Sequence, residues 1–128
     1  QEQESTKNNR GIAICNLAMM YDQGKGVSEK PKLAYKYYKK AAELGDTNAQ
    51  CNLGVLYHEG RGIIQNDESA IYWTKKAARK GDDKAQYNLG LAYLEGHGVR
   101  VNKKLAKRWL EKAAANGHKD AKNKLKNL

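Results

Sequence analysis

The sequence predicts an all-α protein, a right-handed α/α superhelix of three 36-residue helical hairpins followed by a C-terminal capping helix. Three observations lead to this prediction. The chain of 128 residues aligns with itself without gaps when it is shifted by 36 residues. Each unit contains two segments with helical spacing of apolar residues, and glycines separate these segments. One hairpin cannot bury its apolar face alone, so such units are stable only when they stack.

The same residue types recur in every unit. They are a leucine, a tyrosine, a Gly-x-Gly pair, an aromatic residue, an Ala-Ala pair and a closing glycine. The columns are Leu17, Leu53, Leu89, Leu125; Tyr21, Tyr57, Tyr93; Gly24, Gly60, Gly96; Gly26, Gly62, Gly98; Tyr37, Trp73, Trp109; Ala41-Ala42, Ala77-Ala78, Ala113-Ala114; and Gly45, Gly81, Gly117. We therefore expect one domain over residues 9–128, with repeats at about 13–48, 49–84 and 85–120.

The apolar spacing predicts seven helices. They are expected over residues 9–22, 31–44, 47–58, 67–80, 83–94, 103–116 and 119–127. In the second repeat, for example, Ala49, Leu53 and Leu56 lie on one helix face. The last helix keeps Ala121 and Leu125 in register but is otherwise polar, as a capping helix with one face in water requires. Residues 1–8 have no apolar content and are expected to form a disordered tail.

Residues that favour helix ends bracket these segments. Asn66 and Asn102 precede second helices as N-cap residues, and Pro31 occupies the favoured first-turn position of another. Asp46 and Asp82 can cap the helices that follow them. The closing glycine of each repeat suits a left-handed C-terminal cap.

The net charge of +10 raises the question of nucleic-acid binding. Most of the 24 Lys and Arg residues fall on the second helices and the capping helix, which form the outer layer, whereas the aromatic residues belong to core columns. Single-strand binding needs exposed aromatic residues among the cations, and no groove-reading motif is present. We interpret the cations as a solvated surface that can also attract an acidic partner protein, with nucleic-acid binding as the disfavoured alternative.

The sequence carries no motif for catalysis or metal binding. His58, His97 and His118 form no His-x-x-x-His pair, and there is no Cys-x-x-Cys or nucleophile elbow. Cys51 and His58 share a helix face, but two ligands do not make a zinc site. Cys15 and Cys51 occupy one column in adjacent repeats, and such helices lie about 8–10 Å apart or more, so we expect free thiols. No cofactor is expected, and no apolar run is long enough to span a membrane.

A second stripe of side chains follows the first helix of each hairpin. The stripes are Cys15, Met19, Asp22; Cys51, Val55, His58; and Tyr87, Leu91, Leu94. Their i, i+4, i+7 spacing places each on one helix face, where they could form a partly apolar groove for a peptide or helix. The alternative is that they pack against the neighbouring repeat. Asn16, Asn52 and Asn88 also recur, and either contact a bound backbone or brace the loop.

These columns resemble the Sel-1-like repeat family, a relative of the tetratricopeptide repeat. The family pattern is roughly Ala-x-x-x-Leu-Gly-x-x-Tyr-x-x-Gly-x-Gly-Val followed by Ala-x-x-Trp-Tyr-x-Lys-Ala-Ala-x-x-Gly. Residues 85–99 and 106–117 match it in the third repeat, and the resemblance covers nearly all of residues 10–126. By analogy with tetratricopeptide repeats, the first helices and their stripes would line the concave side.

The resemblance implies a non-catalytic scaffold that binds a partner protein or peptide in bacterial signalling, envelope assembly, host interaction or toxin immunity. It favours an exported protein over a cytoplasmic one, and we expect a monomer. A cysteine-rich branch of the family has a disulfide in each repeat and has been credited with β-lactamase-type activity. This chain departs from that branch, because Ala42, Ala78 and Ala114 stand near the expected first cysteine of each pair. An envelope hydrolase or β-lactam-binding enzyme is therefore a disfavoured alternative.

Overall fold

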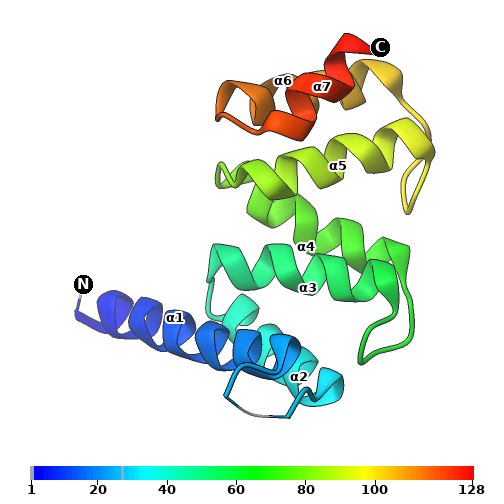
Figure 1. Ribbon diagram of the computed structural model, residues 1–128. Coiled ribbons are helices and arrows are strands. Elements are labelled where there is room, and N and C mark those ends of the chain that lie inside the picture. The colour runs from blue at the N-terminus through cyan, green and yellow to red at the C-terminus, as the bar shows by residue number, and fades with distance from the viewer. Residues whose placement is uncertain (1, 27) are drawn as a thin grey trace.

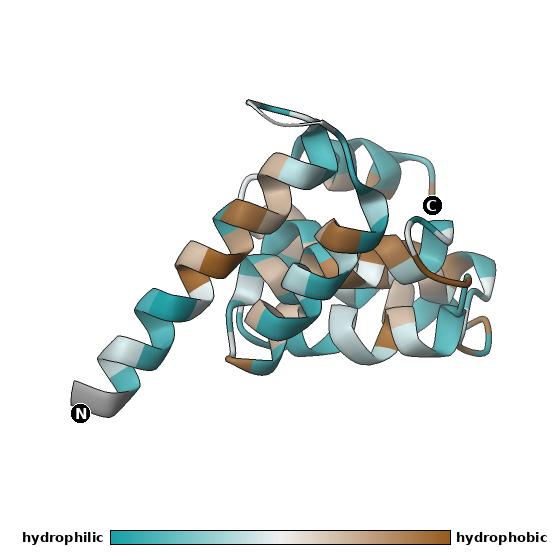
Figure 2. Ribbon diagram, turned by 90° about the horizontal axis from the view of Figure 1, so that it is seen from below, coloured by the Kyte–Doolittle hydropathy of each residue, from teal (hydrophilic) through white to brown (hydrophobic). Residues whose placement is uncertain are grey.

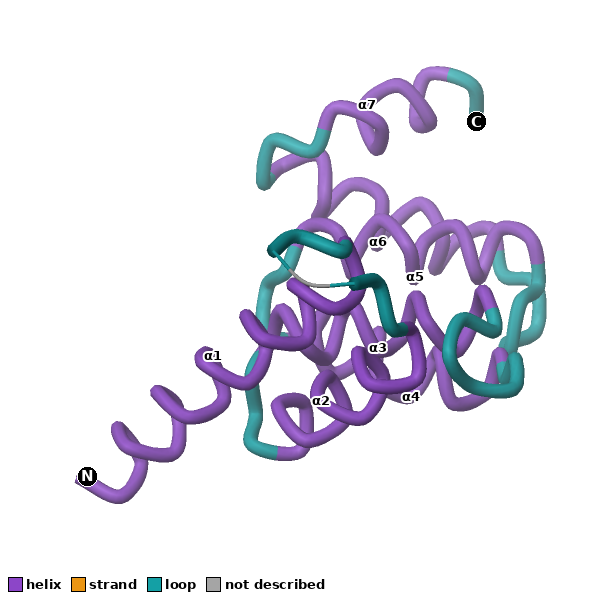
Figure 3. Tube along the Cα trace, turned by 60° about the horizontal axis from the view of Figure 1, so that its bottom comes forward, coloured by secondary structure: helices purple, strands orange, loops and turns teal. Residues whose placement is uncertain are grey.

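The computed structural model describes residues 2–26 and 28–128, and this part of the chain contains seven helices and no strand (Figure 3). The helices are α1 (Glu2–Gln23), α2 (Pro31–Glu43), α3 (Thr47–Glu59), α4 (Asp67–Arg79), α5 (Asp83–Glu95), α6 (Lys103–Ala115) and α7 (Lys119–Lys126). The all-α prediction is confirmed. Apart from the start of α1, each helix begins and ends close to its predicted position.

The helices form three stacked hairpins, α1–α2, α3–α4 and α5–α6, with α7 as the cap. Each second helix packs against its own first helix and against the first helix of the next unit. Figure 1 shows α1, α3, α5 and α7 following one another along the stack, with α4 between α3 and α5. The predicted solenoid of three repeats and a capping helix is confirmed.

Helix α1 begins earlier than the sequence predicts. It starts at Glu2, within the expected disordered tail of residues 1–8, whereas Gln1 lies outside the described residues. Residues 4–10 are exposed and extend away from the stack (Figure 2). This segment buries no apolar side chain, so its helicity comes from backbone hydrogen bonds that continue the packed part of α1.

The predicted helix caps are present. The side chains of Asp46, Asp82, Asn66 and Asn102 accept hydrogen bonds from backbone N–H groups three residues later, at 2.9, 2.8, 3.0 and 3.1 Å. His118 caps α7 in the same way, because its Nδ1 accepts from the N–H of Ala121 at 3.1 Å. Each cap satisfies a donor that has no partner within its helix, and thereby fixes where the helix begins.

Small residues allow the two helices of a hairpin to approach closely. Gly54 in α3 and Gly90 in α5 are buried, and a Cβ on them would lie only 3.1 Å from the carbonyl oxygen of Ala70 and 3.2 Å from that of Ala106. Ala18 is the equivalent residue in α1 and is fully buried. A helix-interior glycine costs about 1 kcal/mol relative to alanine, so the close crossing must offset that cost.

The second glycine of each Gly-x-Gly loop packs a hairpin onto the one before it. Gly62 has φ +77°, and a Cβ there would overlap the carbonyl oxygen of Pro31 at the start of α2. Gly98 has φ +75°, and a Cβ there would overlap the carbonyl oxygen of Asp67 at the start of α4. Gly26, in the first repeat, has the same φ of +75° but nothing within 4 Å of such a Cβ. These loops therefore set the spacing between hairpins.

We predict that Gly98→Ala lowers the free energy of unfolding by about 1–3 kcal/mol more than Gly26→Ala does. Both variants place an alanine at a left-handed φ, which costs about 1–2 kcal/mol. Only Gly98→Ala adds an overlap with the backbone of a neighbouring helix. Urea denaturation of the two variants and the wild type measures the difference. Equal losses would show that the loop does not hold the third hairpin against the second.

Candidate functional site

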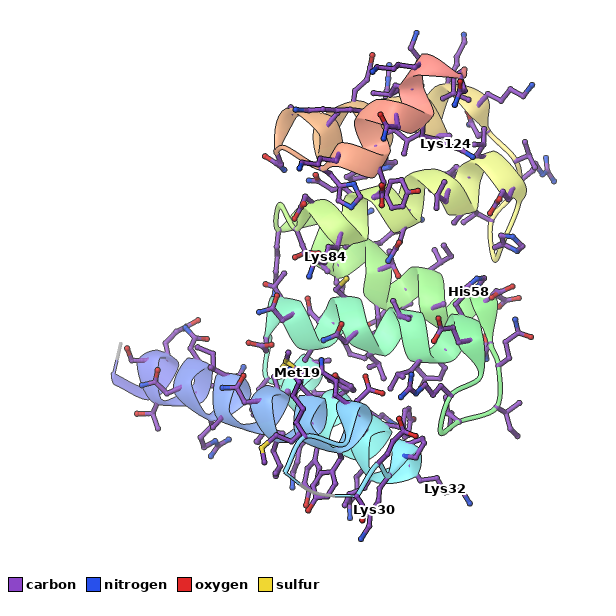
Figure 4. The ribbon with its side chains drawn as sticks, in the orientation of Figure 1. Met19, Lys30, Lys32, His58, Lys84 and Lys124 are labelled. Atoms are coloured by element: carbon purple, nitrogen blue, oxygen red, sulfur yellow. The ribbon has the colours of Figure 1, made fainter. Side chains whose placement is uncertain are left out.

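The N-terminal members of the predicted stripes pack inside the molecule. Cys15 and Cys51 are only 3% and 6% exposed, so little of either side chain can touch a partner in this structure. Met19 packs against the core cluster that joins the first hairpin to α3, on the side of α1 that faces α3 (Figure 4). The ring of Tyr87 stacks on the imidazole of His118, with 4.5 Å between ring centroids. These residues therefore pack against the neighbouring repeat, which was the alternative interpretation of the stripes.

The two cysteines are free thiols, as predicted. Burial, together with the charge of the Asp46 carboxylate and a hydrogen bond to it, raises the pKa of Cys15 to about 12. Burial likewise raises the pKa of Cys51 to about 12, with Asp82 in the role of Asp46. Each thiol therefore lies beside the N-cap aspartate of the helix α3 or α5 and stays protonated, which makes it a small apolar core residue.

The middle members of the second and third stripes, Val55 and Leu91, meet with His58 at one pocket, which we call the central pocket. It has a volume of about 200 Å³ and is lined by residues of α3, α4 and α5. Val55, His58 and Leu91 from the stripes line it, together with Asn88. The remaining lining residues are Gly54, Glu59, Asp67, Ala70, Ile71, Thr74, Ala92, Glu95 and His97.

The inner surface of the central pocket is mostly apolar. Val55 and Leu91 are partly buried and face it from α3 and α5, and Ile71 faces it from α4. Gly54 and Ala70 contribute little side chain, so the helix backbones are close to the surface there. Such an apolar hollow with polar groups at one edge is the usual form of a binding site.

A histidine–carboxylate cluster forms the polar edge of the central pocket. His58 Nδ1 lies 2.9 Å from Asp67 Oδ1, and His97 Nδ1 lies 3.9 Å from Asp67 Oδ2. His97 Nε2 is also 3.4 Å from Glu95 Oε1, and the two imidazole centroids are 5.3 Å apart. Figure 4 places His58 on the side of α3 that faces α5. Within the described residues, no group of three or more His, Cys, Asp or Glu side chains is arranged to hold a metal ion.

The loop after α5 brings His97 to this cluster. Gly98 lies against the backbone of Asp67, so the preceding residue is held at the first turn of α4. Sequence reasoning did not bring Asp67 together with Glu95 and His97, because Asp67 belongs to the second hairpin and the other two to the third. The second glycine of the loop recurs in every repeat. This recurrence could have indicated that the loops make equivalent contacts with the preceding hairpin.

The other predicted site residues lie outside this cluster. Asp22 accepts a hydrogen bond from Tyr38 Oη at 3.3 Å and forms an ion pair with Arg61, with 3.0 Å between Oδ1 and Nη2. Leu94 is partly buried on α5. Asn16 is exposed, whereas Asn52 and Asn88 are partly buried, and in residues 2–26 and 28–128 none of these three amides makes a side-chain hydrogen bond.

The outer layer differs in one respect from the interpretation of the sequence. The aromatic residues are not all taken up by the core, because Tyr72 on α4 is 55% exposed. Lys76 Nζ lies 5.0 Å from the Tyr72 ring centroid and 5.7 Å from that of Trp73. Lys112 Nζ lies 4.7 Å from the Trp109 ring centroid. Each of these rings thus has a lysine of its own helix near one face, and Tyr72 remains exposed on the outer layer.

Comparison with known proteins gives one family and several similar structures. The Sel1 repeat model matches residues 11–46, 47–82 and 83–118. A Sel1 repeat protein from Oxalobacter formigenes is similar, with a TM-score of 0.85 and 36% identity over 90% of this chain and 47% of that one. No curated protein matches the chain in sequence.

Two further solved structures are similar. A protective antigen with an SLR fold, present in uropathogenic Escherichia coli strains, has a TM-score of 0.88 and 39% identity over 90% of this chain and 25% of that one. Helicobacter pylori cysteine rich protein B has a TM-score of 0.73 and 27% identity over 94% and 93% of the two chains. The chain thus spans less than half of the Oxalobacter and Escherichia proteins. Among the described helices, none is long and apolar enough to cross a membrane.

We predict that Cys15 and Cys51 react very slowly with Ellman's reagent in the folded protein at pH 8. A pKa raised from 9.0 to about 12 reduces the thiolate fraction at this pH by roughly a thousandfold, and burial restricts access as well. In guanidinium chloride both thiols should react at the rate of an unhindered cysteine. The absorbance of released thionitrobenzoate measures both rates. Rapid reaction in the folded state would contradict the packing of α1 and α3.

Proposed function

Because the chain belongs to the Sel1 repeat family, we propose that it is a non-catalytic scaffold that binds a partner protein through its concave, first-helix face. Stacked helical repeats present extended surfaces on which a partner can lie. Protein interaction is the general role of such repeats, and it requires no cofactor. We also propose that the protein acts as a monomer, since the surface of α7 is mostly polar.

The observation that carries this proposal is the central pocket. Val55 and Leu91 are only partly buried there, beside an apolar hollow between two repeats. A core residue of this type would be fully covered, as Leu53 and Leu89 are in the same two helices. Apolar surface that stays uncovered in a hollow is characteristic of interaction sites. We therefore place the centre of the partner interface at this pocket.

We further propose that the basic outer layer attracts an acidic region of the partner. The net charge of +10 is large for 128 residues, and the lysines of the second helices are mostly exposed. Such a field raises the rate of association with an oppositely charged protein. Because the solved similar proteins come from bacteria, we place this function in a bacterial context, and we favour an exported protein in signalling, envelope assembly, host interaction or toxin immunity.

We predict that Leu91→Gln lowers the affinity for the partner at least about tenfold, which corresponds to about 1.4 kcal/mol. The substitution removes a large apolar group from the proposed interface and keeps good helix propensity. Tyr72→Gln is the matched control, because it removes an exposed apolar group from the outer side of α4. Its affinity should stay within about twofold of the wild type.

The partner is first captured with the intact protein and identified by mass spectrometry, and the purified partner is then titrated by calorimetry. Circular dichroism confirms that both variants are folded. Unchanged affinity of Leu91→Gln would refute the concave interface. A loss that is confined to Tyr72→Gln would move the interface to the outer layer.

Salt should act mainly on the association rate. If an acidic partner region is attracted by the outer layer, raising the salt concentration from about 0.05 M to about 0.5 M should slow association by roughly tenfold or more, with a smaller change in the dissociation rate. Surface plasmon resonance separates the two rates. An association rate that does not depend on salt would contradict the acidic partner.

A further inference from the structure

We propose that the central pocket binds a lysine or arginine side chain from the partner protein. The aliphatic stem would lie on the apolar surface of Val55, Ile71 and Leu91, and the cationic group would lie among the carboxylates at the edge. This inference rests on the proposed function, because it names the chemistry that the partner presents at the centre of the interface.

The charge of the pocket differs from that of the rest of the protein. Three carboxylates line it, from Glu59, Asp67 and Glu95, and none of its described lining residues is Lys or Arg. With both lining histidines neutral the formal charge is −3, and with both protonated it is −1. The sign is negative in either state, although the chain has a net charge of +10. A cationic guest is therefore attracted locally, whereas an acidic one is repelled.

The shape of the pocket suits a side chain that is apolar along its length and charged at its end. The volume of about 200 Å³ is bordered by aliphatic groups, and the carboxylates of Asp67 and Glu95 come together around His97. Lysine and arginine bury their methylene groups on apolar surface while the charged group stays near polar partners. A purely apolar guest would cover the same surface but would partly desolvate the carboxylates without giving them a partner.

The junction between the first two repeats shows this chemistry within the chain itself. Arg61, which stands at the position of His97 one repeat earlier, reaches back to the first hairpin. Its Nη2 donates to the backbone oxygen of Asp22 at 2.6 Å and to Glu29 Oε2 at 3.1 Å. A guanidinium from the protein thus already neutralises the carboxylates of that junction.

The junction between the second and third repeats has neither the arginine nor the large tyrosine of the first junction. Tyr38, which is buried in the first hairpin, is replaced in the second by Thr74 at the equivalent position. Arg61 is replaced by His97, which pairs with carboxylates only at 3.4 and 3.9 Å. The smaller Thr74 side chain leaves room where a tyrosine ring would lie. Among residues 2–26 and 28–128, no Lys or Arg forms an ion pair with Glu59, Asp67 or Glu95. This junction is therefore the one suited to a cation from another protein.

Synthetic peptides that differ at one position test the proposal. We would use the amidated and acetylated peptide Gly-Ser-Leu-X-Leu-Ser-Gly with X as lysine, norleucine or glutamate, titrated into the ¹⁵N-labelled protein at low salt. Nuclear magnetic resonance reports both the site and the dissociation constant. The lysine peptide should shift the amide signals of Ile71, Thr74 and Leu91, and should bind about tenfold more tightly than the norleucine peptide. The glutamate peptide should bind more weakly than both.

Charge-neutral variants test the role of the carboxylates. In the double variant Asp67→Asn, Glu95→Gln the preference for lysine over norleucine should fall below about twofold. Glu68→Gln is the matched control, since it removes a carboxylate from the same first turn of α4 without lining the pocket. It should keep the tenfold preference. Because Asp67 is the first residue of α4, thermal unfolding of each variant shows that the comparison is made on folded protein.

The outcomes separate this inference from the proposed function. Equal binding of the lysine and norleucine peptides would overturn the cationic guest and leave an apolar interface. Peptide-induced shifts elsewhere on the protein, or no binding of the lysine peptide, would overturn the inference as well. The proposed function fails only if the affinity for the natural partner is unchanged in Leu91→Gln.

Discussion

The burial of each second helix between two first helices is the constraint on which the rest of the structure depends. A single hairpin has no second surface for its apolar face, so every repeat needs the next one. Close approach requires a small residue at each crossing, which is Ala18, Gly54 or Gly90. Once the helices are this close, the size of the side chain opposite the glycine determines whether the space between the helices is filled or left as a pocket. Leu110 is fully buried opposite Gly90, whereas Thr74 lies opposite Gly54 beside the central pocket.

The fold could be predicted because the same constraint acts three times and leaves the same residues in each repeat. The columns of leucine, alanine and glycine mark the crossings, and Asp46, Asn66, Asp82 and Asn102 mark the helix starts where they can accept from the backbone. The beginning of α1 could not be predicted in this way. Apolar content indicates whether a segment packs, but a helix can extend beyond its packed part, because adding a residue to an existing helix is much easier than starting a new one.

The candidate site could be predicted only in part, because helical spacing gives the face of a residue but not its depth. Cys15 and Val55 belong to equivalent stripes, yet the first is buried and the second lines the pocket. How deeply a residue is buried depends on the neighbouring hairpin that covers it. The spacing within one helix contains no information about that hairpin. The pairing of Asp67 with His58 and His97 depends on a contact between hairpins as well. Comparing the loop glycines across repeats could have indicated that contact, since Gly62 and Gly98 touch equivalent helix starts.

Function in such a stack follows from the places where one repeat departs from the others. Where equivalent positions of the three repeats have the same residue type, that residue maintains the packing. Such positions therefore indicate little about a partner. The change from Tyr38 to Thr74 leaves space, and the change from Arg61 to His97 removes a permanent cation from the same junction. Both changes occur at one pocket, where their effects combine into a hollow with an apolar wall and a negative edge. The net charge of the chain is positive, whereas the lining of the pocket is negative. The net charge is dominated by lysines of the outer layer that do not line the pocket. The chemistry of a partner is therefore better inferred from the local departures than from the average composition.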